Sequence, residues 1–272
     1  MAASSTESEG QFASIFETFR SELDEHYDRR EKIVKASRDI TALSKKIIFS
    51  LQRTRDVNAP IPPRIVKENE PRFQQIRELF ESILPDITGL NAWRYQWQIS
   101  PGIQEFVEAV SFQHYLEHQT LISRDEVAAK LPEGVLLTEE DYLMGILDMT
   151  GELMRFAVTT LSTATAAADS ASKGGTSSEE GGGTASKVLT LPPKKAGIVV
   201  DLRELRSLLE LLTVPRRHGH FVMRDLGNKL EVMQTSVHKV ERAAYGIMVR
   251  GSERPSGWTP DLSSNMVDVE GY

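Results

Sequence analysis

The stretch "TEEDYLMGILDMTGELMRFAVTTL" (residues 138–161) decides the fold class of this protein. Its apolar residues recur every three or four positions, which is the period of a helix with one buried face. Thr138 and the three acids after it form a typical helix start, because negative charge there favours the helix dipole. Inside this predicted helix Asp148 and Glu152 lie four residues apart, and like charges at that spacing repel each other. The tertiary structure should therefore supply something that offsets the repulsion.

The helical period continues through most of the chain. Residues 11–55 lack proline and predict one long helix, which the prolines of "NAPIPPR" (58–64) end. Further helices are expected over residues 64–84, 102–122, 123–131, 138–161, 199–212 and 221–250. Because no stretch alternates like a strand, the sequence predicts an all-α fold, a single-domain bundle of about seven helices over residues 11–253.

Three segments lack this apolar periodicity. Residues 1–10 and 254–272 are expected to be a disordered N-terminus and a loose C-terminal tail. The Ala-, Ser- and Gly-rich segment at about residues 163–187 is expected to be a flexible insert, since small polar side chains cannot repay the entropy of ordering.

Composition narrows the class of protein. The chain has 272 residues, 40 % of them hydrophobic, and no cysteine, which fits a globular protein of a reducing compartment and excludes disulfides and cysteine-ligated metal sites. No apolar run reaches the roughly 18 residues of a membrane span and no secretory signal is present. We therefore expect a soluble protein that does not enter membranes, located in the cytoplasm and at most shared with the nucleus. A phosphate-binding loop motif is missing, which argues against a nucleotide hydrolase.

A second pair of acids, Glu105 and Glu108 in "PGIQEFVEAV" (101–110), lies three residues apart. Each pair shares one helix face, so two helices packed antiparallel with their pairs opposed would gather four carboxylates. A hard divalent cation such as Mg²⁺ or Mn²⁺ would neutralise them. Such an ion can polarise a phosphodiester and activate a water for in-line attack without a protein nucleophile.

Spacing alone leaves a second interpretation of Asp148 and Glu152 open. Asp141, Gly145, Arg155 and Thr159 extend the same stripe, which is also typical of a solvated helix face. Arg155 can then pair with Glu152 three residues before it.

One predicted helix is basic although the whole chain has a formal net charge of −7. Its candidates for contacts with phosphates are Arg29, Arg30, Lys32, Lys35 and Arg38. The alternative is a solvated face that pairs with acidic neighbours. In "WRYQWQ" (93–98), Trp93 and Trp97 can stack on bases or belong to the core or an interface. His114 and His118 would need a third ligand to bind a transition metal.

Several blocks resemble the translin family, in the same order from about Phe12 to Glu253. They are "RREKIVKASRDITALSKKIIFSLQR", "SPGIQEFVEAVSFQHYL", "LISRDEV", "DYLMGILDMTGELMRFAV" and "KVERAAYGIMVRGSE". The insert at 163–187 is not a feature of the family, and "LLTVPRRHGHFVMRDLGNKL" (211–230) agrees with it only in helical pattern. The resemblance implies an all-α fold of seven helices that assembles with a translin-like partner into a hollow hetero-oligomer.

The resemblance also implies an activity, that of a Mg²⁺-dependent endoribonuclease with its active site inside the shell. In the matching blocks, the carboxylates that the resemblance implies to be catalytic and metal-binding correspond to Glu105, Glu108, Asp148 and Glu152. The chain is then the catalytic partner, acting on single-stranded RNA and binding single-stranded RNA or DNA through the helix around Arg29–Arg38. The remaining alternative is a nucleic-acid-binding and assembly subunit without chemistry of its own.

Overall fold

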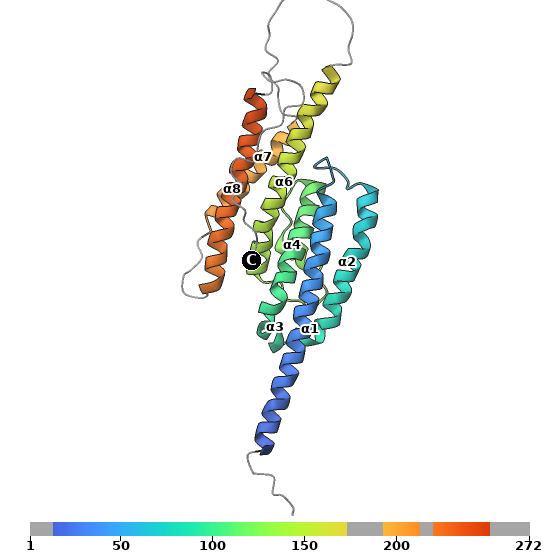
Figure 1. Ribbon diagram of the computed structural model, residues 1–272, viewed down its shortest axis with the longest axis vertical. Helices are drawn as coiled ribbons and strands as arrows, with labels where there is room; N and C mark the ends of the chain where they lie inside the picture. The colour runs from blue at the N-terminus through green and yellow to red at the C-terminus, as the bar shows by residue number, and fades with distance from the viewer. Residues whose placement is uncertain (1–12, 173–192, 213–219, 251–272) are drawn as a thin grey trace, which may run out of the picture.

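The computed structural model of the protein describes residues 13–172, 193–212 and 220–250, and this part is helical without any strand (Figure 1). Two helices of five residues, α3 (Leu90–Arg94) and α5 (Arg124–Ala128), and the 3₁₀ turn η1 (Leu84–Asp86) lie between longer ones. The long helices are α1 (Ala13–Leu51), α2 (Pro63–Ile83), α4 (Gln96–His118), α6 (Glu139–Ser172), α7 (Pro193–Glu210) and α8 (His220–Arg250). The predicted all-α fold is confirmed.

Helix α4 is the centre of the bundle. It packs between α1 and α6, while α2 covers the other side of α1 and both α7 and α8 pack on α6 (Figure 1). Its sequence is apolar around most of its circumference, and Ile103, Val107, Phe112 and Leu116 are fully buried. Helices α1, α4 and α6 run in the same direction, as their colours show in Figure 1. The antiparallel packing of the two acid-bearing helices supposed from the sequence is therefore wrong, because residues 119–138 lead the chain back to the level at which α4 begins before α6 starts. Acids on α4 and α6 are therefore brought to the same level of the bundle.

The predicted helix starts are confirmed by their caps. The Thr138 hydroxyl accepts the Asp141 amide of α6 at 3.0 Å, and Ser123 and Glu126 form a reciprocal capping box at the start of α5. Several boundaries differ from the prediction, since α1 ends at Leu51 instead of residue 55 and α7 begins at Pro193, six residues before the predicted start at 199. Helix α4 begins six residues before Gly102, at Gln96, and Pro101 lies inside it, where its ring nitrogen cannot donate the backbone hydrogen bond that another residue would make.

Helix α6 also continues further than predicted, to Ser172, into the segment expected to be a flexible insert. Its last residues include the run "TATAAADSAS" (163–172), and alanine is the best helix former. The rest of the predicted insert, residues 173–187, lies outside the described residues, as do the two predicted loose ends at 1–10 and 254–272.

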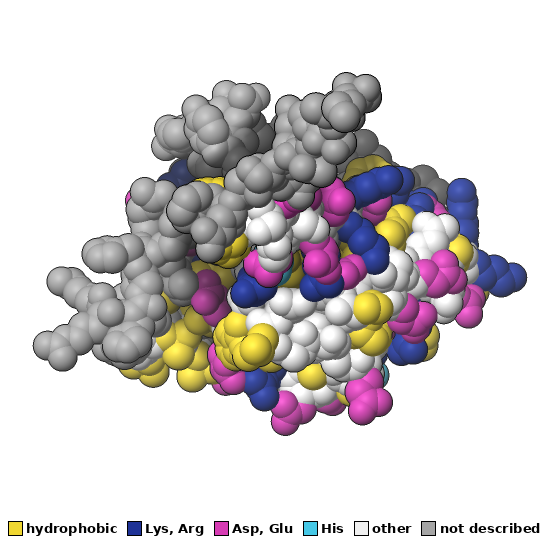
Figure 2. All heavy atoms as spheres, turned by 90° about the horizontal axis from the view of Figure 1, so that it is seen from below, with side chains coloured by type: hydrophobic (Ala, Val, Ile, Leu, Met, Phe, Trp, Pro, Cys, Tyr) yellow, Lys and Arg dark blue, Asp and Glu magenta, His cyan; other side chains and the backbone are white. Residues whose placement is uncertain are grey.

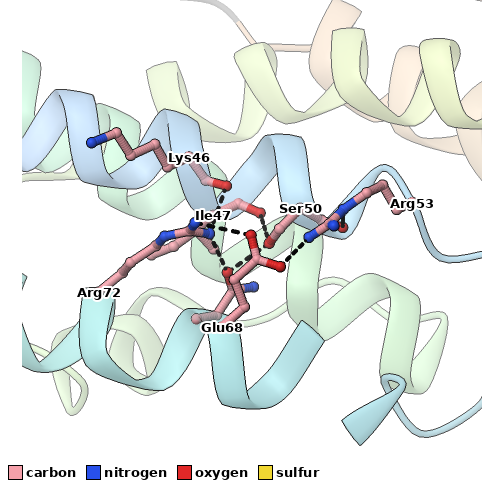
Figure 3. A network of polar contacts seen from close by, with 7 residues as sticks. Lys46, Ile47, Ser50, Arg53, Glu68 and Arg72 are labelled. Carbon is pink, nitrogen blue, oxygen red and sulfur yellow. Dashed lines mark hydrogen bonds and ion pairs between the residues drawn. The ribbon is translucent and has the colours of Figure 1, made fainter. Parts of the chain in front are cut away.

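A polar network fastens α2 to α1 (Figure 3). The Glu68 carboxylate of α2 accepts hydrogen bonds from Arg53 and, at 2.9 Å, from Arg72. These two guanidinium groups, Arg53 first, hold the pKa of Glu68 below its usual range. Beside it the buried Ser50 hydroxyl of α1 donates to the side-chain oxygen of Asn69 at 2.6 Å. The outer helix is thus fixed to α1 by polar contacts as well as by apolar packing.

The N-terminal half of α1 projects beyond the rest of the bundle (Figure 1). The apolar stripe predicted along this helix is present, but only its part from Ile33 onward is buried. Before Ile33 the large apolar side chains are exposed, and they are Ile15, Phe16, Phe19, Leu23 and Tyr27. Seen from this end, the molecule shows hydrophobic side chains lying open among acidic and basic ones (Figure 2). No helix of the described part is both long and apolar enough to cross a membrane.

Candidate active site

The four predicted acids lie on two helices that pack directly on each other. Helix α4 carries Glu105 and Glu108, and α6 carries Asp148 and Glu152. Gly145 of α6 makes the close approach of the two helices possible, because a Cβ atom there would lie 2.6 Å from the Val107 Cβ of α4. Such a distance is far inside van der Waals contact. The packing of α4 on α6 therefore decides where the acids meet.

Glu108 is the most enclosed of the four, with 7 % of its surface exposed. Burial is the main cause that raises the pKa of Glu108 to about 9, and repulsion from Glu105, Asp148 and Glu152 adds to it. Lys229 of α8 acts in the opposite direction. Because all three other acids influence Glu108, the fold brings the predicted set within electrostatic range of one another. Near neutral pH Glu108 holds its proton, which relieves part of the repulsion.

Cationic and amide side chains from two further helices offset the rest. Lys45 of α1 lies 3.3 Å from the Glu105 carboxylate, and Lys229 of α8 lies 2.5 Å from that of Asp148. The side-chain amide of Gln52, which directly follows the end of α1, donates to the Glu152 carboxylate at 2.7 Å. Lys45 limits the rise of the pKa of Glu105, which burial causes. In the structure the like charges of α6 are therefore offset by protein groups.

The donor chemistry of the site fits a hard divalent cation. The Glu105 Oε2 atom is buried and has no hydrogen-bond partner, and Glu108 forms no hydrogen bond or ion pair to another described residue. Carboxylate oxygens without a hydrogen-bond partner are available to bind a cation, and carboxylates are the ligands that Mg²⁺ and Mn²⁺ prefer. As they stand, however, no three His, Cys, Asp or Glu side chains of the described residues are placed to hold a metal ion. Binding would require Lys45 and Lys229 to release their carboxylates.

The alternative of a solvated stripe on α6 holds for only part of that stripe. Asp141, at its start, is 2 % exposed and accepts hydrogen bonds from the side chains of Gln96, Ser100 and Gln104. Arg155 at the other end has a side chain that is 66 % exposed, and it pairs with Glu152 at 3.2 Å as the spacing predicted. The stripe is thus buried at one end and open at the other.

Sequence reasoning missed three residues that contact the predicted acids, and it named Asp141 only as a member of the stripe and of the helix start. The role of Asp141 was detectable, because Thr138 three residues before it makes the pattern of a capping box. Lys45, Gln52 and Lys229 left no such signal, since each meets its acid across a large distance in the sequence.

The predicted basic residues of α1 separate into two groups. Arg29 and Lys32 face η1 and pair with Asp86, at 3.8 and 2.7 Å. Arg30 and Arg38 instead line a shallow groove between α1 and α4, together with Trp97. Lys35 is exposed and makes no hydrogen bond or ion pair to a described residue. The structure therefore does not bring all five onto one surface.

The other sequence candidates are placed as follows. Trp93 and Trp97 are 70 % and 59 % exposed, so neither belongs to the core of this chain. The His114 and His118 rings lie 4.7 Å apart on α4, and His114 bonds to the Thr120 hydroxyl at 3.0 Å. The described residues supply no third ligand of the His, Cys, Asp or Glu type for this pair.

Comparison with known proteins agrees with this architecture. Translin-associated protein X of Mus musculus is 29 % identical over 282 aligned residues, covering 94 % of this chain and 86 % of that protein. The Translin-associated protein X homolog of Schizosaccharomyces pombe is 30 % identical, covering 88 % of this chain and 89 % of its own. The fold is similar to that of apo-NeC3PO in its crystal structure, with a TM-score of 0.54 at 18 % identity over 84 % of this chain and 94 % of that one. The sequence pattern of the Translin family matches residues 28–251, and the chain therefore belongs to the translin family.

Proposed function

We propose that this chain is the catalytic subunit of a Mg²⁺-dependent endoribonuclease that cleaves single-stranded RNA within a hetero-oligomer with a translin-like partner. One observation carries the proposal more than any other. Glu108 is buried beside three further acids from α4 and α6, and burial first and these acids second raise its pKa to about 9. A fold seldom keeps such a costly group without a use, and strongly perturbed carboxylates are typical of active sites.

The four acids would share the work of the site. Glu105, Glu108, Asp148 and Glu152 would hold the cation, and Mg²⁺ or Mn²⁺ bound there would supply Lewis acidity toward the phosphodiester and activate a water for in-line attack. Glu108 must lose its proton to become a ligand, so binding of the ion would release about one proton. Lys45 and Lys229 would give up their carboxylates and become available to the phosphates of the RNA.

The partner is suggested by the relatives and by an exposed surface. The relatives from mouse and fission yeast carry association with translin in their name. The projecting half of α1 exposes Phe16 to 69 %, Leu23 to 68 % and Tyr27 to 61 % on one face of a helix. Apolar side chains at helical spacing on a projecting helix are typical of an interface with another chain.

A second function is favoured by the ion pairs of the site. Lys45, Lys229 and Arg155 already neutralise three of the four acids, and a protein that only binds nucleic acid would need no metal there. The chain would then be a nucleic-acid-binding and assembly subunit, and the acids would serve its packing.

The decisive experiment is cleavage of a fluorescent single-stranded RNA by the chain co-expressed with its translin-like partner, with Mg²⁺ and with chelator. Asp148→Asn should lower the cleavage rate by at least a hundredfold, because it removes a charged ligand, and the double variant Glu105→Gln/Asp148→Asn should abolish cleavage. RNA affinity measured in chelator should remain within a few-fold. Glu117→Gln, also on α4 but outside the four acids, is the matched control and should cleave like the wild type.

If Asp148→Asn or the double variant cleaves RNA at the wild-type rate, the proposed catalytic role of these acids is contradicted. An intact complex that binds RNA but does not cut it with Mg²⁺ or Mn²⁺ would instead establish the binding subunit.

A further inference from the structure

Glu152 of α6 is bound by a neutral side chain that reaches it from the end of α1. The side-chain amide nitrogen of Gln52 donates to the Glu152 Oε2 atom at 2.7 Å and to the Glu152 backbone carbonyl oxygen at 2.9 Å. Because one nitrogen is bonded to both oxygens, rotation of the Glu152 side chain would break one of these bonds. The contact therefore fixes the rotamer of Glu152 as well as the place of one carboxylate oxygen.

Gln52 is itself held in place by its neighbours along the chain. Leu51, the last residue of α1, is fully buried, and Arg53 binds the Glu68 carboxylate of α2 (Figure 3). The backbone amide of Gln52 donates to the Ile48 carbonyl oxygen at 3.0 Å. A half-buried donor on so firmly attached a piece of backbone can orient the acid that it binds.

The second oxygen of Glu152 is bound less firmly. The Arg155 guanidinium lies 3.2 Å from Oε1 and 3.4 Å from Oε2, but its side chain is 66 % exposed. Exposed ion pairs of this kind contribute little free energy and are easily exchanged. When a cation approaches the four acids, Arg155 can therefore leave Glu152 while Gln52 keeps Oε2. Glu152 then offers one oxygen, Oε1, to the ion.

The number of oxygens that Glu152 offers bears on which cation fits the site. Ca²⁺ takes about six to eight oxygen ligands in a flexible arrangement and often binds a carboxylate through both oxygens. Mg²⁺ is smaller and demands a nearly regular octahedron, in which each carboxylate supplies one oxygen at a fixed place. A carboxylate with one oxygen tied to Gln52 meets the second demand and not the first.

We propose that Gln52 is a positioning residue that makes Glu152 a one-oxygen ligand and thereby selects a small hard cation, Mg²⁺ or Mn²⁺, over Ca²⁺. The inference rests on the proposed function, since it gives Gln52 this role through a cation bound by the four acids. Gln52 contacts neither the ion nor the RNA and acts through Glu152 alone. Removal of such a hydrogen-bond partner of a metal ligand typically weakens metal binding ~10–100-fold.

The test is Mn²⁺ binding by the full chain in complex with its translin-like partner, measured from the electron paramagnetic resonance signal of free Mn²⁺. Ca²⁺ affinity follows from competition with Mn²⁺. Gln52→Met keeps the length of the side chain without its donor, and it should weaken Mn²⁺ binding about tenfold. Ca²⁺ binding should stay within about twofold, because the released Oε2 of Glu152 becomes a second ligand atom for the larger ion.

Gln113→Met is the matched control and should bind both ions like the wild type. Gln113 is also a half-buried glutamine whose amide donates to a glutamate, but that glutamate is Glu117, outside the four acids. The double variant Glu105→Gln/Asp148→Asn gives the Mn²⁺ binding that other sites of the complex contribute.

Further measurements separate positioning from a loss of folding. The melting temperature of the Gln52→Met complex in chelator should stay close to that of the wild type, because the two side chains have similar volumes. With RNA present, the variant should need about tenfold more Mg²⁺ for half-maximal cleavage, while kcat at saturating Mg²⁺ changes less than about threefold. Gln52→His, which keeps a ring N–H donor, should recover part of the Mn²⁺ affinity.

Three outcomes would overturn the inference. A folded Gln52→Met complex that binds both ions like the wild type, although the double variant has lost Mn²⁺, would refute the role of Gln52 and leave the proposed function standing. Equal losses of Mn²⁺ and Ca²⁺ affinity would show a structural role without selectivity. If the wild type binds Mn²⁺ no more tightly than Glu105→Gln/Asp148→Asn, the four acids hold no cation, and the proposed function falls together with this inference.

Discussion

Glu108 lies almost fully enclosed between α4 and α6, where burial and three neighbouring acids hold its proton. In the unfolded chain its carboxyl has an ordinary pKa of about 4.3. Because its pKa in the folded state is about 9, the folded protein retains a proton that the unfolded chain releases at neutral pH. Stability must therefore fall as the pH rises from about 4.3 to 9, at a rate of up to ~1.4 kcal/mol per pH unit for this one group.

Glu108→Gln should remove this pH dependence, since the amide resembles the protonated acid and cannot ionise. In chelator at pH 8 we expect the variant complex to be more stable than the wild type by on the order of 2 kcal/mol. At pH 4, below the pKa of the unfolded chain, the two should melt at nearly the same temperature. Thermal melts at pH 4, 6.5 and 8 test this, and a difference that does not grow with pH would show that the pKa of Glu108 is not raised in the folded protein.

At the scale of the helix, the site depends on how closely α6 approaches α4. Gly145 lies one turn before Asp148, and a Cβ atom added there would be 2.6 Å from the Val107 side chain and 2.8 Å from the Gln104 carbonyl oxygen. Neither neighbour is the end of a flexible side chain, so the helices themselves must move apart. Gly151, six residues further along α6, has no such neighbour within 4 Å.

Gly145→Ala should therefore destabilise the complex by about 1–3 kcal/mol, the usual cost of overpacking. It should also slow RNA cleavage, because the acids of α6 would be displaced from those of α4. Gly151→Ala is the control in the same helix, and it should stabilise the protein by ~0.5–1 kcal/mol, since alanine is the better helix former. Melting curves measure the stability of both variants. Equal effects of the two substitutions would show that α6 does not approach α4 closely at Gly145.

At the scale of the whole molecule, the large apolar side chains of the projecting half of α1 lie exposed, although His26 in the same half bonds to the Tyr95 hydroxyl at 2.6 Å. Its apolar face is continuous in period with the buried stripe that begins at Ile33. Acids outnumber bases beside it, since residues 13–28 contain Glu17, Glu22, Asp24, Glu25 and Asp28 against Arg20 alone. Such a face suits a partner helix whose apolar stripe is flanked by Lys or Arg.

Phe16→Ser/Phe19→Ser should accordingly weaken assembly with the translin-like partner by at least tenfold, because it removes two large apolar side chains from the interface. Folding of the chain should not suffer, since these side chains are 69 % and 54 % exposed. Phe49→Ser is the control, as Phe49 lies on the same helix within the bundle and is 75 % exposed. Sedimentation of the co-expressed chains measures assembly. If the double variant assembles like the Phe49→Ser control, the partner binds to another surface of the chain.

The sequence by itself determined the class of fold and the main helices, because apolar period, caps and prolines act within a few residues of chain. Its spacing also placed Glu105 with Glu108 and Asp148 with Glu152 on one helix face each, whereas their role as a metal site stays a prediction. The close register of α4 on α6, the pairing of Asp148 with Lys229 and the gathering of Trp97 with Arg30 and Arg38 were decided only by the tertiary structure. Tertiary contacts also decided that one half of the α1 stripe is core and the other half surface. The physical reason is that periodicity tells which side chains share a face, whereas burial, ion pairing and pKa depend on what lies opposite that face.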